Sequence, residues 1–194
     1  MIARTHDLAA ATGLLVVVII MSPLPSMSLA TIIAALIANQ LGAIAPDIDQ
    51  PTAPFWRNIS FGRIFGRFFG RIMGGHRFIT HSLLGLALMG FLVHWLLMFI
   101  HPLFPKIDIG IVWWAFIIGM VSHLIMDSFT KEGVPWLLPI PIKFGFPPLR
   151  RLRITTGKGI EKFIIFPLLI VAIVGLSTAY YPDLIDLIDK RMTS

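Results

Sequence analysis

Five long apolar stretches alternate with polar segments along the chain, and this pattern predicts a membrane protein built from helices. The stretches cover residues 8–21, 27–45, 82–100, 109–126 and 163–180. A helix needs about 20 consecutive apolar residues to span the hydrocarbon core of a bilayer, and all but the first stretch approach that length. We therefore expect an all-α integral membrane protein with five transmembrane helices, in a single membrane domain over residues 1–194.

The first stretch is the shortest of the five and ends before Pro23 and Pro25. Its length fits a span that thins the bilayer locally or is partly re-entrant. A signal peptide is the alternative, because Arg4 gives a positive start and Ser28-Leu29-Ala30 resembles a cleavage site. Cleavage there would remove His6 from the mature protein.

Composition supports the membrane interpretation and limits the chemistry. Hydrophobic residues make up 56% of the chain and charged residues 13%, whereas soluble domains carry about 25% charged residues. Lipid can cover such an apolar surface. The chain has no cysteine, so disulfides and thiolate metal sites are excluded, and any metal must be bound by His, Asp, Glu or backbone oxygen.

Basic residues are unevenly divided between the two sides that five spans define. Of the 16 Lys and Arg residues, 13 lie before the first stretch or in the loops 47–80 and 128–162. The positive-inside rule places these segments in the cytoplasm, with the N-terminus inside and the C-terminus in the periplasm of a bacterial inner membrane. Because the formal charge of +6 follows this topology, we do not expect nucleic acid as a partner.

The loop between the second and third stretches contains a basic amphipathic segment over residues 55–73, where Arg63, Arg67 and Arg71 alternate with Phe and Ile. This pattern predicts a helix on the inner leaflet that contacts anionic lipid head groups. Glycines at the same spacing weaken the helix prediction; they are Gly62, Gly66 and Gly70. Residues 133–159 are rich in Pro and Gly and predict no regular element.

Seven His and Asp residues lie at the cytoplasmic ends of four stretches: His6, Asp47, Asp49, His76, His81, His123 and Asp127. Ionisable groups near a bilayer are costly and are candidates for function. The i, i+4 spacing of His123 and Asp127 puts both on one helix face. Asp47 and Asp49 lie between two prolines in an extended or turning segment, from which both carboxylates can approach one cation. Mixed N and O ligands favour Zn or Mn, as one or two ions.

Three other residues near these stretches have structural interpretations. Thr80 is the expected N-cap of the third helix. His94 falls in the middle of that helix and His101 at its outer end. We expect both histidines to be packing or interfacial residues rather than ligands.

Three motifs carry a family resemblance: Pro46–Pro51, His76–Ser82 and Ser122–Pro135. Together they resemble the YdjM-type family of inner-membrane, metal-dependent hydrolases, also described as LexA-regulated. The likeness runs from about His6 to Glu161 and includes Thr156-Gly157. It implies a helical membrane fold with the seven His and Asp residues as metal ligands. Gln50 stands where the family often has His, and Phe78 where Gly is common.

The sequence thus favours a membrane-bound, metal-dependent hydrolase that acts at the cytoplasmic face on a lipid or lipid-linked phosphoester. Expected catalytic residues are His76, Arg77 and His81; expected substrate-binding residues are Arg77, Thr156, Lys158 and Glu161, with Arg153 a weaker candidate. One alternative is a metal-ion or proton transporter, which normally binds its cargo at the membrane midplane. Another is a non-enzymatic membrane protein with a structural metal.

Overall fold

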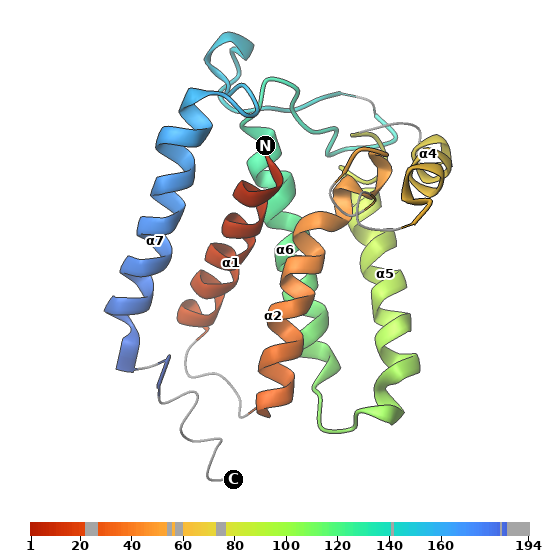
Figure 1. The fold of residues 1–194 in the computed structure, drawn as a ribbon, viewed down its shortest axis with the longest axis vertical. Coiled ribbons are helices and arrows are strands. Elements are labelled where there is room, and N and C mark those ends of the chain that lie inside the picture. Colours follow the sequence, from red (N-terminus) through yellow and green to blue (C-terminus); the bar gives the residue numbers. More distant parts are fainter. Residues whose placement is uncertain are drawn as a thin grey trace.

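Five long helices lie side by side in the computed structural model, which describes residues 1–21, 27–53, 56, 60–72, 77–140, 142–182 and 184–185 (Figure 1). They are α1 (Ala3–Ile20), α2 (Leu29–Ile44), α5 (Leu83–Ile100), α6 (Ile109–Ser128) and α7 (Phe166–Ala179). The 3-10 helix η1 (Ala45–Asp49) continues α2, and the π-helical turn η4 (Glu161–Ile165) leads into α7. Within these ranges there is no sheet, and 5 helices are long and apolar enough to cross a membrane. The predicted fold class is confirmed.

Helix α1 begins at Ala3, earlier than the apolar pattern suggested, because Arg4, Thr5, His6 and Asp7 are themselves helical. The helix therefore reaches 18 residues and qualifies as a span. It packs against α2, α6 and α7. If this segment were cleaved as a signal peptide, the bundle would lose a helix that contacts three others.

Helices α2 and α6 form the centre of the bundle and approach each other closely. A Cβ added at Gly42 would overlap the carbonyl of Phe116, and a Cβ at Gly119 would overlap the carbonyl of Asn39. Small residues permit such contact, which drives helix association in lipid. The buried Asn39 side chain donates to the carbonyl oxygen of Ala115 at 3.1 Å, so this polar group inside the bundle is satisfied.

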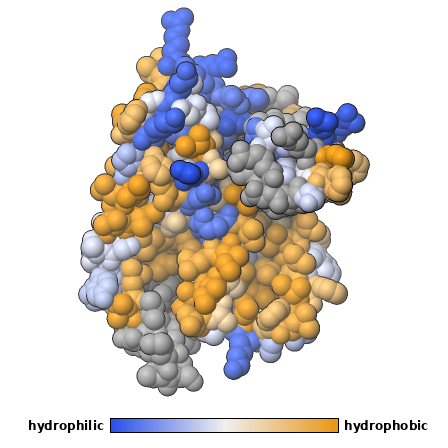
Figure 2. Space-filling view, in the orientation of Figure 1, coloured by the Kyte–Doolittle hydropathy of each residue, from blue (hydrophilic) through white to orange (hydrophobic). Residues whose placement is uncertain are grey.

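Apolar side chains cover the outside of the helices, while hydrophilic residues gather at the end where α1 begins and α6 ends (Figure 2). No residue of helix α7 is buried inside the protein, and in the candidate span that contains α5 only 11% of the residues are buried. An exposed apolar surface of this extent fits a protein surrounded by lipid.

Within the basic amphipathic segment 55–73, helix α4 covers Gly62–Ile72 and lies at the polar end of the bundle (Figure 1). The glycines of α4 lower its helix propensity, but they lie where the helix packs against Asp49, Pro51 and Trp56. A Cβ at Gly66 would crowd Pro51 and Trp56, and one at Gly70 would crowd the carbonyl of Asp49. Close contact with η1 and with the segment after it therefore explains why these positions are glycine.

The segment from Phe129 to Ile160 crosses the polar end of the bundle without forming a long element (Figure 1). It contains the short 3-10 helix η3 (Arg150–Leu152) and two isolated bridges, as its Pro and Gly content predicted. One N-cap prediction was wrong. Helix α5 is capped by Ser82, whose hydroxyl accepts the N–H of Gly85 at 3.1 Å, because Thr80 makes other contacts.

Candidate metal centre

Helix α6 supplies two buried side chains, His123 and Asp127, on one face of its last turns. The Nδ1 atom of His123 lies 2.6 Å from the carbonyl oxygen of Ala43 on α2. A carbonyl oxygen can only accept a hydrogen bond, so Nδ1 carries the proton. The neutral ring then presents the lone pair of Nε2 to the end of the bundle where Asp127 lies.

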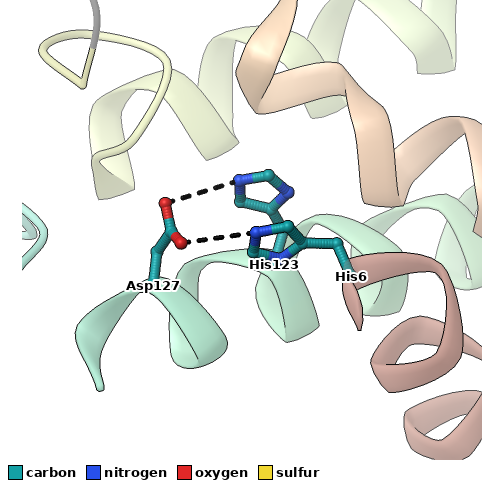
Figure 3. A group of neighbouring side chains, drawn as sticks. All are labelled: His6, His123 and Asp127. Atoms are coloured by element: carbon teal, nitrogen blue, oxygen red, sulfur yellow. Dashed lines mark ion pairs between the residues drawn. The ribbon is translucent and has the colours of Figure 1, made fainter. Parts of the chain in front are cut away.

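Helix α1 adds His6, which stacks on His123 with ring centroids 3.7 Å apart and planes inclined by 9°. Its Nε2 atom lies 3.3 Å from Oδ1 of Asp127 (Figure 3). The ring is buried, and neither of its nitrogens makes a hydrogen bond within the part of the chain that the structure describes. Two parallel imidazoles with unsatisfied nitrogens are a donor set that suits a cation.

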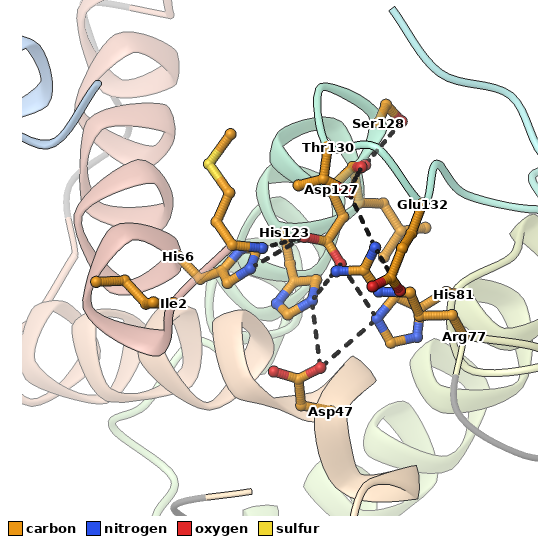
Figure 4. A network of polar contacts seen from close by, with 12 residues as sticks. Ile2, His6, Asp47, Arg77, His81, His123, Asp127, Ser128, Thr130 and Glu132 are labelled. Carbon is orange, nitrogen blue, oxygen red and sulfur yellow. Dashed lines mark hydrogen bonds and ion pairs between the residues drawn. The ribbon is translucent and has the colours of Figure 1, made fainter. Parts of the chain in front are cut away.

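Asp47 and His81 approach from the other side of His123 (Figure 4). Oδ1 of Asp47 lies 3.6 Å from Nε2 of His81 and 3.8 Å from Nε2 of His123. Oδ2 of Asp127 lies 3.6 Å from Nε2 of His81 and 3.8 Å from Nε2 of His123. These four atoms form a closed ring. The Asp47 side chain is 21% exposed, whereas the other three are buried.

The four edges of this ring are close in length to the separations between the ligands of a metal ion. Four ligands placed tetrahedrally around a metal at roughly 2.0–2.2 Å lie roughly 3.3–3.6 Å from one another. Among the described residues, two groups could hold an ion, His6 with His123 and Asp127, and Asp47 with His81 and His123; the ligand atoms of each group lie within 4.8 Å of one another. His123 belongs to both groups, but one lone pair on Nε2 can bind only one ion.

Asp47 and Asp49 point in different directions, although the sequence suggested that they approach a cation together. Both lie in η1, and residues two apart in a 3-10 helix are turned about 120° from each other around its axis. The buried Oδ2 atom of Asp49 accepts the hydroxyl of Thr80 at 2.5 Å and the backbone N–H of Arg77 at 3.1 Å. Asp49 belongs to neither of the ligand groups found among the described residues.

Arg77 lies beside the cluster and is buried. Its Nη2 atom is 2.6 Å from Oδ2 of Asp127, and its Nη1 atom donates to Oγ1 of Thr130 at 3.0 Å (Figure 4). Nη1 also lies 3.4 Å from Oε2 of Glu132. The backbone of Arg77 has φ of 60°, a left-handed conformation that is unusual for a residue with a side chain and typical of functional sites.

Glu161 is fully buried and holds backbone groups with both carboxylate oxygens. Oε1 accepts the N–H of Ile2 at 2.7 Å, and Oε2 accepts the N–H of Gly157 at 2.6 Å. Glu161 thus ties the start of α1 to the start of η4. The amino group of Met1 in turn contacts Oδ1 of Asp127.

Other sequence candidates lie apart from these contacts. Thr156 and Lys158 are exposed, and Arg153 donates to the carbonyls of Pro147 and Pro148 at 2.8 and 3.0 Å. His94 is exposed on α5 and meets Trp113 edge to face at 6.1 Å. His76 lies outside the described residues.

Sequence reasoning missed three groups that orient the cluster: the hydroxyls of Thr80 and Thr130, and the carbonyl of Ala43. Thr80 and Thr130 are buried polar residues. Thr80 directly precedes His81 and Thr130 follows Asp127 by three residues, so their positions in the sequence could have indicated this role. No sequence signal marks the Ala43 carbonyl, because it depends on how α2 and α6 are rotated against each other.

Comparison with known proteins gives a family but no activity. The profile described as "YdjM inner membrane protein" matches residues 1–184. The uncharacterized protein YvsG of Bacillus subtilis (strain 168) is similar, with 30% identity over 146 residues, which is 74% of this chain and 75% of YvsG. No solved structure matches the chain significantly. The chain belongs to the YdjM family of inner membrane proteins, and its buried His and Asp side chains could hold a metal ion.

Proposed function

We propose that this multi-pass inner membrane protein is a metal-dependent hydrolase whose centre opens at the cytoplasmic membrane face. The observation that carries the proposal is the closed ring formed by Asp47, His81, His123 and Asp127, with edges of 3.6–3.8 Å. Buried carboxylates are costly without positive charge nearby. Arg77 and the Met1 amino group supply such charge to Asp127, and a bound divalent cation, Zn or Mn by the chemistry of the donors, adds positive charge at the ring.

The proposed residue roles follow from the geometry. Nε2 of His81 and of His123 would hold the ion together with Oδ1 of Asp47. Oδ2 of Asp127, 3.6 and 3.8 Å from the same two nitrogens, would complete the ligand set. A bound metal of this kind activates water and polarises the scissile group. His6 faces the second oxygen of Asp127, where it either takes part in binding a second ion or accepts a proton from the nucleophile.

Arg77 is the proposed partner of a substrate phosphate. Its guanidinium contacts Asp127 and reaches the exposed Glu132, so it lies between the buried ligands and the surface. Bidentate recognition of phosphate oxygens suits arginine. For Thr156 and Lys158, which are exposed, and for His76, a role in substrate binding or catalysis remains a proposal from the sequence.

A lipid or lipid-linked phosphoester is the proposed substrate, because the ligands lie at the ends of spans, near the depth of lipid head groups. The distribution of Lys and Arg supports a cytoplasmic location for this end. Helix α4 supports the same assignment. It exposes Arg67 and Arg71 together with Phe65 and Phe68, a combination that suits the anionic surface of the inner leaflet.

A transporter is less well supported than a hydrolase. Transporters bind cargo near the midplane between broken helices, whereas these ligands lie at one end of continuous helices. His94 faces outward in the middle of α5. Asn39 is buried within α2 but bonds the Ala115 carbonyl, which gives it a structural role.

The test combines metal content with turnover. We expect the protein purified in mild detergent to contain Zn or Mn by elemental analysis, and to release inorganic phosphate from vesicles that contain phosphatidic acid or a long-chain alkyl phosphate. Asp47→Asn should abolish release, and His94→Ala should retain it. Bound metal without hydrolysis of either phosphoester would support the structural-metal alternative. Metal accumulation inside proteoliposomes would support transport.

A further inference from the structure

Asp49, Thr80 and His81 form a chain of buried hydrogen bonds that ends at the proposed metal ligand. The hydroxyl oxygen of Thr80 lies 2.5 Å from Oδ2 of Asp49 and 3.0 Å from Nδ1 of His81. All three residues are at most 2% exposed. The three groups are therefore shielded from bulk water, and the hydrogen-bonding capacity of each group indicates where its proton lies.

The hydroxyl of Thr80 has one proton, and its short contact with Asp49 is typical of a hydrogen bond to an ionised carboxylate. An ionised carboxylate can only accept, so the proton of Thr80 points to Asp49. The oxygen of Thr80 then has only lone pairs to offer to His81. The bond at 3.0 Å therefore requires a proton on Nδ1 of His81, and in the neutral ring the lone pair is on Nε2.

Nε2 of His81 is the atom that faces Oδ1 of Asp47 and Oδ2 of Asp127, at 3.6 Å each. A proton on that atom would exclude a metal ion. His123 shows the same arrangement by other means, since its Nδ1 atom contacts the carbonyl of Ala43 at 2.6 Å. Both rings thus have Nδ1 engaged by the protein and Nε2 directed at the same point.

We propose that Thr80, oriented by Asp49, is a positioning residue that holds His81 in the Nδ1-protonated form and so makes Nε2 available to a metal ion. Partners of this type orient metal-binding histidines and raise their affinity in many sites. Asp49, which the sequence suggested as a ligand, acts here through Thr80. The inference rests on the proposed metal centre for its purpose, but the state of the His81 ring can be measured without metal.

A purely structural role for Thr80 makes a different prediction. Ser82 already caps α5, and Oδ2 of Asp49 also accepts the backbone N–H of Arg77, so the turn before α5 has other supports. Thr80→Val keeps the shape of the side chain and removes the hydroxyl. Thr80→Ser keeps the hydroxyl and removes a methyl group. Thr31→Val is a matched control, because Thr31 is also buried but bonds the backbone of Lys106 and Asp108.

The experiment measures the ring nitrogens of His81 by ¹⁵N NMR in metal-free protein at about pH 8.5, where imidazoles of ordinary pKa are neutral. His81→Gln assigns the signals. Wild type, Thr80→Ser and Thr31→Val should show Nδ1 protonated, and Thr80→Val should show a proton on Nε2 in part or all of the molecules. Zn²⁺ affinity, measured against a competing chelator, should fall about 10- to 100-fold in Thr80→Val alone.

The two readouts separate this inference from the proposed function. A Thr80→Val protein that keeps Nδ1 protonated and binds Zn²⁺ as tightly as wild type would overturn the inference. So would an equal loss of affinity in Thr80→Val and Thr80→Ser, since the hydroxyl would then be irrelevant. If the His81 ring follows Thr80 but wild type binds no Zn²⁺ or Mn²⁺, the positioning role stands and the proposed metal centre fails.

Discussion

His6 and His123 stack ring on ring, 3.7 Å apart and within 9° of parallel, although they come from the first helix and from α6. Both rings direct Nε2 at Asp127: His6 lies next to Oδ1 of the carboxylate, and His123 lies next to Oδ2. The contact joins α1 to the centre of the bundle at the point where the proposed ligands meet. It also means that metal binding should depend on residues far apart in the sequence.

Replacing single ligands should therefore lower bound metal, whichever helix carries them. We expect His81→Ala, His123→Ala and Asp127→Asn each to reduce Zn²⁺ affinity by more than about 100-fold, because loss of a direct ligand should exceed the 10- to 100-fold effect of an outer partner. Chelator competition with elemental analysis measures this.

Controls come from histidines of the same protein. His94→Ala and His101→Ala should bind metal as wild type does, because His94 is exposed and packs on Trp113 and His101 begins the short 3-10 helix η2 (His101–Leu103) at the opposite end of α5. Equal metal content in all these variants would show that the cluster is not a metal site.

The sequence predicted the spans well because hydropathy alone determines which segments lie in lipid. It also predicted that the ends of four helices bring His and Asp residues together. The structure confirms this for the described members, which are His6, Asp47, Asp49, His81, His123 and Asp127. The sequence could not predict that Asp47 and Asp49 diverge, because this follows from α2 continuing into a 3-10 helix. Nor could it give the stacking of His6 on His123, which depends on how α1 and α6 are rotated against each other.

Arg77 should stabilise the metal-free protein more than the metal-bound protein. Its guanidinium is the buried partner of Asp127, and removing one member of such a pair costs about 3–5 kcal/mol. Arg77→Met should lower the free energy of unfolding by that order, and Zn²⁺ should restore part of it by neutralising Asp127. Denaturant titration with and without Zn²⁺ measures both quantities.

The backbone strain at Arg77, with φ of 60°, is nearly the same for Met, so the comparison reports the loss of the guanidinium with its contacts to Asp127, Thr130 and Glu132. Arg150→Met is the control, because Arg150 is exposed and its loss should change stability by less than about 0.5 kcal/mol. A deficit in Arg77→Met that Zn²⁺ leaves unchanged would contradict a shared cation site at Asp127.

Glu161 should keep the start of α1 in place. Glu161→Gln removes the charge that strengthens its bonds to the N–H groups of Ile2 and Gly157, and a charge-assisted bond contributes about 1.5–3 kcal/mol. We expect faster hydrogen exchange in residues 2–8, because the bond that holds this segment to Glu161 is weakened. Unchanged exchange over residues 2–8 would remove Glu161 as the anchor of this segment.

The proposed ligands can share one site in a membrane only if the helix ends that carry them lie on the same side. Reporter fusions after residues 74 and 145 should give cytoplasmic signals, and a fusion after residue 182 a periplasmic one. The reason is that loops 47–80 and 128–162 carry most of the Lys and Arg residues. A cytoplasmic signal after residue 182 would mean an even number of spans and would contradict the arrangement of five.

Gly119 should be essential for bringing α2 and α6 together. A Cβ there would overlap the Asn39 carbonyl, so Gly119→Ala should push the helices apart and lower stability by about 1–3 kcal/mol. The displacement should also weaken Zn²⁺ binding, because the contact of His123 with Ala43 spans the same interface. Gly175→Ala on α7 is the matched control, since nothing lies within 4 Å of its added Cβ. Alanine at that position should be neutral or slightly stabilising through its higher helix propensity. If both alanine variants bind Zn²⁺ equally, the close approach of α2 and α6 does not set the geometry of the centre.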